Sequence, residues 1–154
     1  CLVYRLIFLM VAEDRNLLHP EKAKPEARAL YAQGYSLQSL RKQCYRAATW
    51  DKHHDRYEGV KIVFRALTQG QPTLALPALG GLFAEARLPH LETARLRNRA
   101  FMEALYRLSW LADKNGMVPV NWRTKSMKLS FALRRASRRL RAAAFSFLFR
   151  LMSG

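Results

Sequence analysis

The sequence predicts a mainly α-helical protein that folds as a single domain, with an irregular segment rich in glycine and proline and at most one short strand. Three observations support this prediction. Apolar residues recur at the spacing of an amphipathic helix in several segments. Glycine and proline separate those segments. The length of 154 residues, 50% of them hydrophobic, suits one domain with its own core and is too short for two.

The first predicted elements are two helices joined by a connection. Residues 2–14 are apolar on nearly every face, which predicts a central helix that is buried on all sides. Residues 16–25 contain two prolines and form the connection, because a proline disfavours helical backbone in the residue before it. Ser36 is the expected N-cap of the second helix, whose apolar residues are Leu37, Leu40, Cys44 and Ala48.

The third predicted helix has the clearest pattern. Gly70 and Pro72 end it. His53 lies on its apolar side, so we expect a hydrogen-bonded core histidine. The apolar stripe consists of Trp50, His53, Tyr57, Val60, Phe64 and Leu67.

An irregular segment follows over residues 71–91, which contain three prolines and the pair Gly80-Gly81. Its leucines predict that it packs on the core. A further helix is expected over 98–111, then a turn at Asn115-Gly116 and a short extended piece over 117–120. The predicted core is Leu6, Leu9, Leu40, Val60, Phe64, Leu67, Phe101, Leu105 and Leu108.

The positive charge is concentrated at one end of the chain. The net charge is +16, from 27 basic and 11 acidic residues. All 11 acidic residues and 17 basic ones precede Lys114, whereas residues 114–154 hold ten basic residues and no acidic one. A basic helix over 125–150 would line one side with guanidinium groups that suit phosphates or an anionic membrane surface. The candidate nucleic-acid contacts are Arg134, Arg135, Arg138, Arg139 and Arg141.

No complete active site is visible in the sequence. Asp51, His54, Asp55 and Glu58 are metal-ligand types that would share a helix face, but they lack an H-E-x-x-H arrangement, so we predict a solvated acidic face. Gly80-Gly81 lacks the residues of a phosphate-binding loop and is predicted to be a turn. No serine or cysteine has the context of a catalytic triad. We therefore predict no catalytic, cofactor-binding or metal-binding residue.

The cysteines and the hydropathy bear on location. Cys1 and Cys44 cannot form a disulfide framework, which favours a reducing compartment and predicts a cytoplasmic protein. The nearly uncharged runs are shorter than the roughly 18 to 20 residues of a membrane span, so no membrane partner is predicted.

Four segments, taken in order, resemble one protein family. Residues 5–18 (RLIFLMVAEDRNLL) are similar to the R-L-x-F-L-x-x-A-E-D-R-x-L-L helix in the N-terminal helical region of large bacterial DNA adenine-N6 methyltransferases, those of type IIG restriction-modification enzymes and of BREX-type and DISARM-type phage defence. Residues 35–41 (YSLQSLR), 76–83 (LPALGGLF) and 96–109 (LRNRAFMEALYRLS) resemble the segments that follow. The resemblance covers about residues 2–122.

The resemblance implies a non-catalytic, N-terminal fragment of a longer enzyme. The full-length parent would transfer a methyl group from S-adenosylmethionine to the exocyclic amine of a flipped adenine in DNA. The family's cofactor loop and N-P-P-Y motif are absent from residues 1–154, so no site residue is carried over. The expected partners are DNA and the missing methyltransferase domain. The chain departs from the family pattern at Arg123, so residues 123–154 form a basic tail that is either native or an out-of-frame reading.

Two other functions remain open at this point. A small stand-alone basic helical protein would bind nucleic acid without sequence preference through the tail, a hypothesis that rests on charge alone. A membrane-surface binder would use the same arginines and the phenylalanines that follow them.

Overall fold

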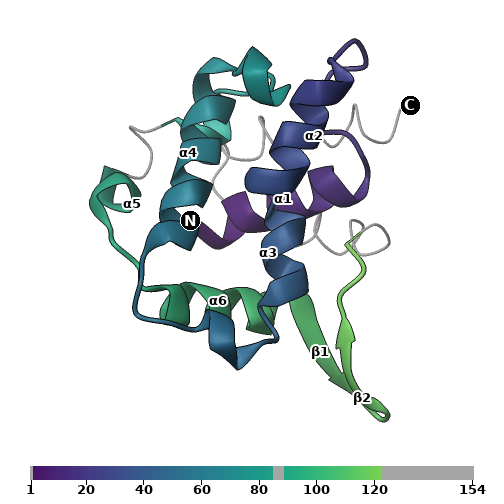
Figure 1. Cartoon of the computed structure of the whole chain (residues 1–154), viewed down its shortest axis with the longest axis vertical. Helices are drawn as coiled ribbons and strands as arrows, with labels where there is room; N and C mark the ends of the chain where they lie inside the picture. Colours follow the sequence, from purple (N-terminus) through teal and green to yellow (C-terminus); the bar gives the residue numbers. More distant parts are fainter. Residues whose placement is uncertain (1, 85–88, 123–154) are drawn as a thin grey trace.

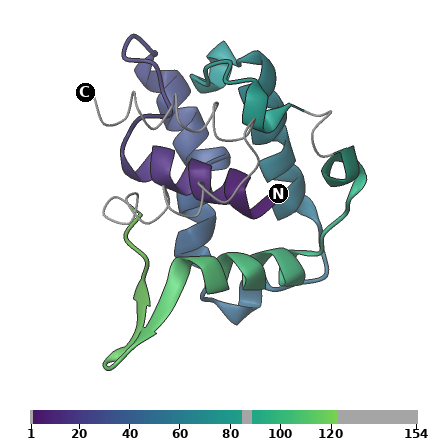
Figure 2. The same cartoon turned by 180° about the vertical axis from the view of Figure 1, so that it is seen from behind.

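The computed structural model describes residues 2–84 and 89–122. Over these residues the protein is mainly helical, which confirms the predicted fold class. Helix α1 (Leu2–Asp14) crosses the middle of the molecule and lies in front of α3 in the view of Figure 2. Its core-facing residues, Leu6 and Leu9 to Ala12, are buried, but Ile7 and Phe8 are only half-buried and Val3 is 40% exposed. The predicted burial on every face is therefore incomplete.

Two helices follow α1 (Figure 1). The sequence pattern did not predict α2 (Pro25–Gly34), because only Ala27 and Tyr31 on it are buried and its apolar stripe is short. Helix α3 (Leu37–Gln43) begins as predicted: the hydroxyl of Ser36 accepts a hydrogen bond of 3.1 Å from the backbone N–H of Ser39. Helix α3 is shorter than expected, and a 3₁₀ turn, η1 (Ala47–Thr49), comes after it.

The next helix, α4 (Asp55–Gln69), starts later than the apolar stripe predicts. Trp50 lies before α4, in the turn that follows α3. Its indole N–H donates a hydrogen bond of 2.9 Å to the carbonyl of Cys44, which holds Trp50 in that turn. His53 also precedes α4 and is exposed, so the prediction of a core histidine is wrong. Val60, Phe64 and Leu67 are buried as predicted.

The irregular segment after α4 packs on the core, as its leucines predict. It contains the 3₁₀ turns η2 (Pro72–Leu74) and η3 (Gly81–Phe83), and the short helix α5 (Pro89–Thr93) follows. The backbone N–H of Leu79 donates to the carbonyl of Leu67 at 2.7 Å, which ties the segment to the end of α4. Phe83 is buried, in contact with the rings of Phe8 and Phe64.

The last described elements are a helix and a β-hairpin that extends away from the helices (Figure 1). Helix α6 (Asn98–Ser109) ends before Leu111, because β1 (Trp110–Asp113) pairs with β2 (Gly116–Pro119) in an antiparallel sheet. Gly116 has φ of +116°, which permits the reversal. The turn is as predicted, but two strands form where at most one was expected.

The core lies where these helices meet. Of the predicted core residues, only Leu40 and Leu108 are half-buried at its edge, and the others are buried. Additional core positions are Met10, Tyr31, Tyr57 and Met102. None of the helices in residues 2–84 and 89–122 is long and apolar enough to cross a membrane.

Candidate functional site

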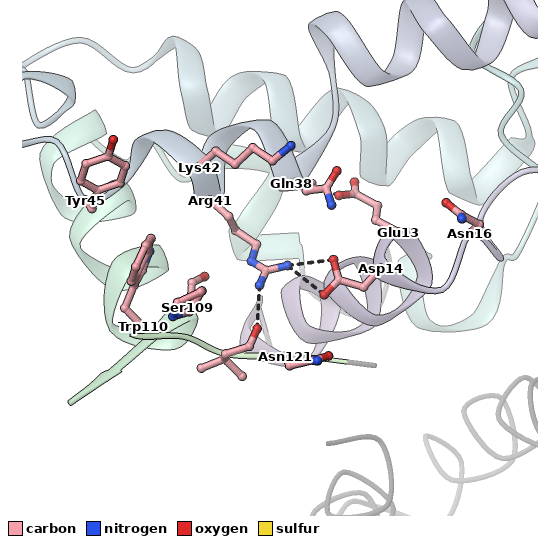
Figure 3. Close-up of a pocket in the computed structure, with 12 residues that line it drawn as sticks. Glu13, Asp14, Asn16, Gln38, Arg41, Lys42, Tyr45, Ser109, Trp110 and Asn121 are labelled. Carbon is pink, nitrogen blue, oxygen red and sulfur yellow. Dashed lines mark hydrogen bonds and ion pairs between the residues drawn. The ribbon is translucent and has the colours of Figure 1, made fainter. Parts of the chain in front are cut away.

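A groove of about 740 Å³ runs between the end of α1, the length of α3 and the base of the hairpin (Figure 3). Tyr45 and Trp110 lie at one end of it and Glu13 and Asn16 at the other. Arg41 lies between the two ends, beneath the rim formed by α3. The groove thus combines aromatic rings with charged and amide side chains.

Glu13 joins the end of α1 to the start of α3. One carboxylate oxygen accepts hydrogen bonds from the Tyr31 hydroxyl and, at 2.8 Å, from the Leu37 backbone N–H. The other accepts from the Gln38 backbone N–H at 2.6 Å. These backbone groups are the free donors of the first turn of α3, where a negative side chain is favourable. Burial raises the pKa of Glu13, and the three hydrogen bonds oppose that rise.

Asp14 and Arg41 connect the same two helices to the hairpin. The Nη1 group of Arg41 donates to both carboxylate oxygens of Asp14, at 3.1 and 3.2 Å. Its Nη2 group donates to the carbonyl of Val120 at 3.0 Å, just after β2. The backbone N–H of Val120 in turn donates to the carbonyl of Ser109 at 2.7 Å. Val120 thus joins the base of the hairpin both to Arg41 on α3 and to Ser109 at the end of α6.

Arg5 makes a similar connection at the other end of α1. Its guanidinium is fully buried and donates to the carbonyls of Leu82 at 3.0 Å and Ala84 at 3.1 Å. It also lies over the rings of Phe64 and Phe83, 5.4 and 5.8 Å from their centroids. A buried arginine held in this way fixes the irregular segment against α1 and α4.

The four residues proposed as metal-ligand types do not share one helix face, because Asp51 and His54 precede α4. Asp51 and Asp55 do converge: each accepts a hydrogen bond of 2.8 Å from the amide of buried Asn98. The cluster joins the starts of α4 and α6, and the backbone N–H of His53 holds the pKa of Asp51 below its usual range. Within the described ranges, no three histidine, cysteine or acidic side chains are grouped to hold a metal ion.

The other sequence candidates also have structural roles. Gly80 and Gly81 both have positive φ and form a turn, as predicted. Ser109 is buried and donates to the sulfur of Met10 at 3.7 Å. Cys44 is buried, and burial raises the pKa of its thiol, which disfavours a reactive thiolate. The candidate nucleic-acid contacts Arg134, Arg135, Arg138, Arg139 and Arg141 lie outside the described residues.

Sequence reasoning missed the groove and the contacts around it. Glu13 and Leu37 are 24 positions apart, and Arg41 and Asp14 are 27 positions apart. No local spacing rule relates residues at such separations. The available signal was the resemblance, in which the A-E-D-R run and the S-L-x-S-L-R run appear together.

Comparison with known proteins adds no family to this picture: no family model, no curated protein and no solved structure matches the chain.

Proposed function

We propose that residues 2–122 are the helical scaffold region of a DNA adenine-N6 methyltransferase of a restriction-modification or phage-defence system. In this proposal the region is not catalytic. It supports a methyltransferase domain that binds S-adenosylmethionine, and it contacts the DNA backbone in the cytoplasm. The cofactor belongs to the parent enzyme, and none of the described residues is assigned to it.

One observation carries the proposal. The resemblance rests on four segments that are far apart in the sequence, and each of the three later segments is hydrogen-bonded to the first. Glu13 and Asp14 bind the second segment through Leu37, Gln38 and Arg41. Arg5 binds the third through the carbonyl of Leu82. Met10 accepts a hydrogen bond from Ser109 of the fourth.

These contacts explain why polar residues occur in an otherwise apolar helix. Arg5 and Glu13 are costly to bury without hydrogen-bond partners. Leu37 and Gln38 of the second segment and Leu82 of the third supply some of these partners. Tyr31 and Ala84, outside the four segments, supply the others, and the Nη1 group of Arg5 has no partner among the described residues. The contacts between the segments therefore position the helices relative to one another. Such a structural role is expected of a scaffold whose catalytic residues lie in another domain.

The experiment that tests the proposal is to read the DNA on both sides of the coding region in all frames. We expect a reading frame that encodes a glycine-rich cofactor loop after a strand, followed by an N-P-P-Y motif. Flanking DNA that encodes neither feature would refute the proposal and would favour the stand-alone nucleic-acid-binding protein.

A further inference from the structure

A row of aromatic side chains leads from the core edge to the groove. The ring centroids of Trp50 and Tyr106 are 6.2 Å apart, and those of Tyr106 and Trp110 are 6.3 Å apart and stacked. Tyr45 continues the row, with its centroid 5.6 Å from that of Trp110 in an edge-on arrangement. Tyr45 and Trp110 both line the groove (Figure 3).

Packing accounts for most of this row but not for its last member. Trp50, Tyr106 and Trp110 are half-buried against the core, and the indole N–H of Trp50 has its partner in the Cys44 carbonyl. Tyr45 is 50% exposed and is not part of the core. A large exposed aromatic ring at the end of a groove is a surface on which another flat group can stack.

Positive charge accompanies the exposed ring. The guanidinium of Arg46 lies 5.5 Å from the centroid of Tyr45, and its Nε donates to the Tyr45 hydroxyl at 3.1 Å. Lys42 lines the groove, is exposed, and forms no hydrogen bond or ion pair with another described residue. The acidic groups of the groove are already engaged, Glu13 by three donors and Asp14 by Arg41. The aromatic end of the groove is therefore left with uncompensated positive charge.

We propose that this groove binds single-stranded DNA, with an unpaired base stacked on Tyr45 beside Trp110 and the neighbouring phosphates held by Lys42 and Arg46. An exposed aromatic ring beside cationic side chains is the arrangement that recognises single strands, because every base has a face that can stack. A duplex keeps its base faces covered and offers this groove only phosphates. The choice of DNA rests on the proposed function, since a methyltransferase that flips a base creates unpaired nucleotides.

The test compares three fluorescently labelled probes of equal length by anisotropy with the full chain: oligothymidine, the same backbone without bases, and a duplex. We expect oligothymidine to bind more tightly than the abasic strand or the duplex. Tyr45→Ala should weaken oligothymidine binding about five- to a hundredfold and leave the abasic affinity unchanged. Tyr45→Phe should keep most of the affinity, because the ring remains.

The charge is tested with matched lysine variants. Lys42→Gln should weaken binding of both single-stranded probes and lower the salt dependence by about one counterion. Lys24→Gln, at an exposed position outside the groove, should change neither. The inference is overturned if wild-type protein binds the abasic strand or the duplex as tightly as oligothymidine. It is also overturned if Tyr45→Ala leaves oligothymidine binding intact or weakens all probes equally.

The comparison of the three probes uses the wild-type protein, so its outcome does not depend on whether a variant folds. Failure of the groove proposal is distinguishable from failure of the proposed function. The proposed function is tested by searching the flanking DNA for methyltransferase motifs, and that search does not depend on this groove.

Discussion

Removing the Glu13 carboxylate tests whether the groove residues hold the helices together. Glu13→Ala leaves three donors without their partner: the Tyr31 hydroxyl and the backbone N–H groups of Leu37 and Gln38. Gln38 is exposed, so water replaces the lost acceptor there. Tyr31 and Leu37 are only 2% and 1% exposed, so their donors remain unsatisfied.

The expected cost follows from these two buried donors. At about 1 to 3 kcal/mol for each unsatisfied group, Glu13→Ala should lower the free energy of unfolding by about 2 to 6 kcal/mol. That is a large part of the roughly 5 to 15 kcal/mol available to a domain. The assay is urea denaturation followed by helical circular dichroism. The matched control is Glu21→Ala at an exposed loop position, which should change stability by less than about 0.5 kcal/mol.

A double-mutant cycle identifies the contact responsible. Tyr31→Phe alone should cost about 1 kcal/mol, because it removes one hydrogen bond to Glu13. In the Glu13→Ala background the same change should be neutral or stabilising, because it removes an orphaned hydroxyl. A Glu13→Ala variant as stable as the Glu21→Ala control, or a Tyr31→Phe cost that is equal in both backgrounds, would refute the reasoning.

Three further predictions concern the core, the Asn98 cluster and the free thiol. Phe64→Ala should cost about 3 to 5 kcal/mol in urea denaturation, whereas Ile62→Ala, on the exposed side of the same helix, should cost under about 1 kcal/mol. The pKa of Asp51 is lowered on folding, so ionised Asp51 stabilises the protein above the usual aspartate pKa of about 3.9. Asp51→Asn should therefore be less stable than the wild type at neutral pH, and this difference in the free energy of unfolding should disappear as the pH falls below about 3.9. Cys44 should resist thiol alkylation, read by peptide mass mapping, until denaturant unfolds the chain, and rapid labelling under native conditions would contradict its burial.

The helices that the sequence predicted well are those with a strong apolar pattern. Residues 2–14 bury the apolar side chains from Leu9 to Ala12, and the stripe through Val60, Phe64 and Leu67 is buried, so local periodicity reports the packing there. Helix α2 was missed because it buries little, although Pro25 in its first turn is a helix-start signal. The start of α4 was misplaced because Trp50 continues the helical spacing while belonging to the preceding turn.

Contacts between distant segments limited the rest of the prediction. Leu111 fits the spacing of α6, but it forms a strand because Val118 pairs with it across the hairpin. The groove depends on Glu13 and Arg41 meeting partners more than 20 positions away, and no local pattern encodes such a meeting. The resemblance places Glu13 and Arg41 in two of its segments, and the structure shows which atoms of those segments make contact.

Adenine methylation in cells that carry the whole locus tests most directly the central proposal, that residues 2–122 support a methyltransferase domain. The measurement is the N6-methyladenine content of genomic DNA with the wild-type sequence, with Glu13→Ala and with the control Glu21→Ala. We predict methylation with the wild-type and control sequences and a marked loss with Glu13→Ala, because a destabilised scaffold would no longer hold the proposed methyltransferase domain. Absence of N6-methyladenine from the wild-type cells, or equal methylation with Glu13→Ala and the wild type, would contradict the account.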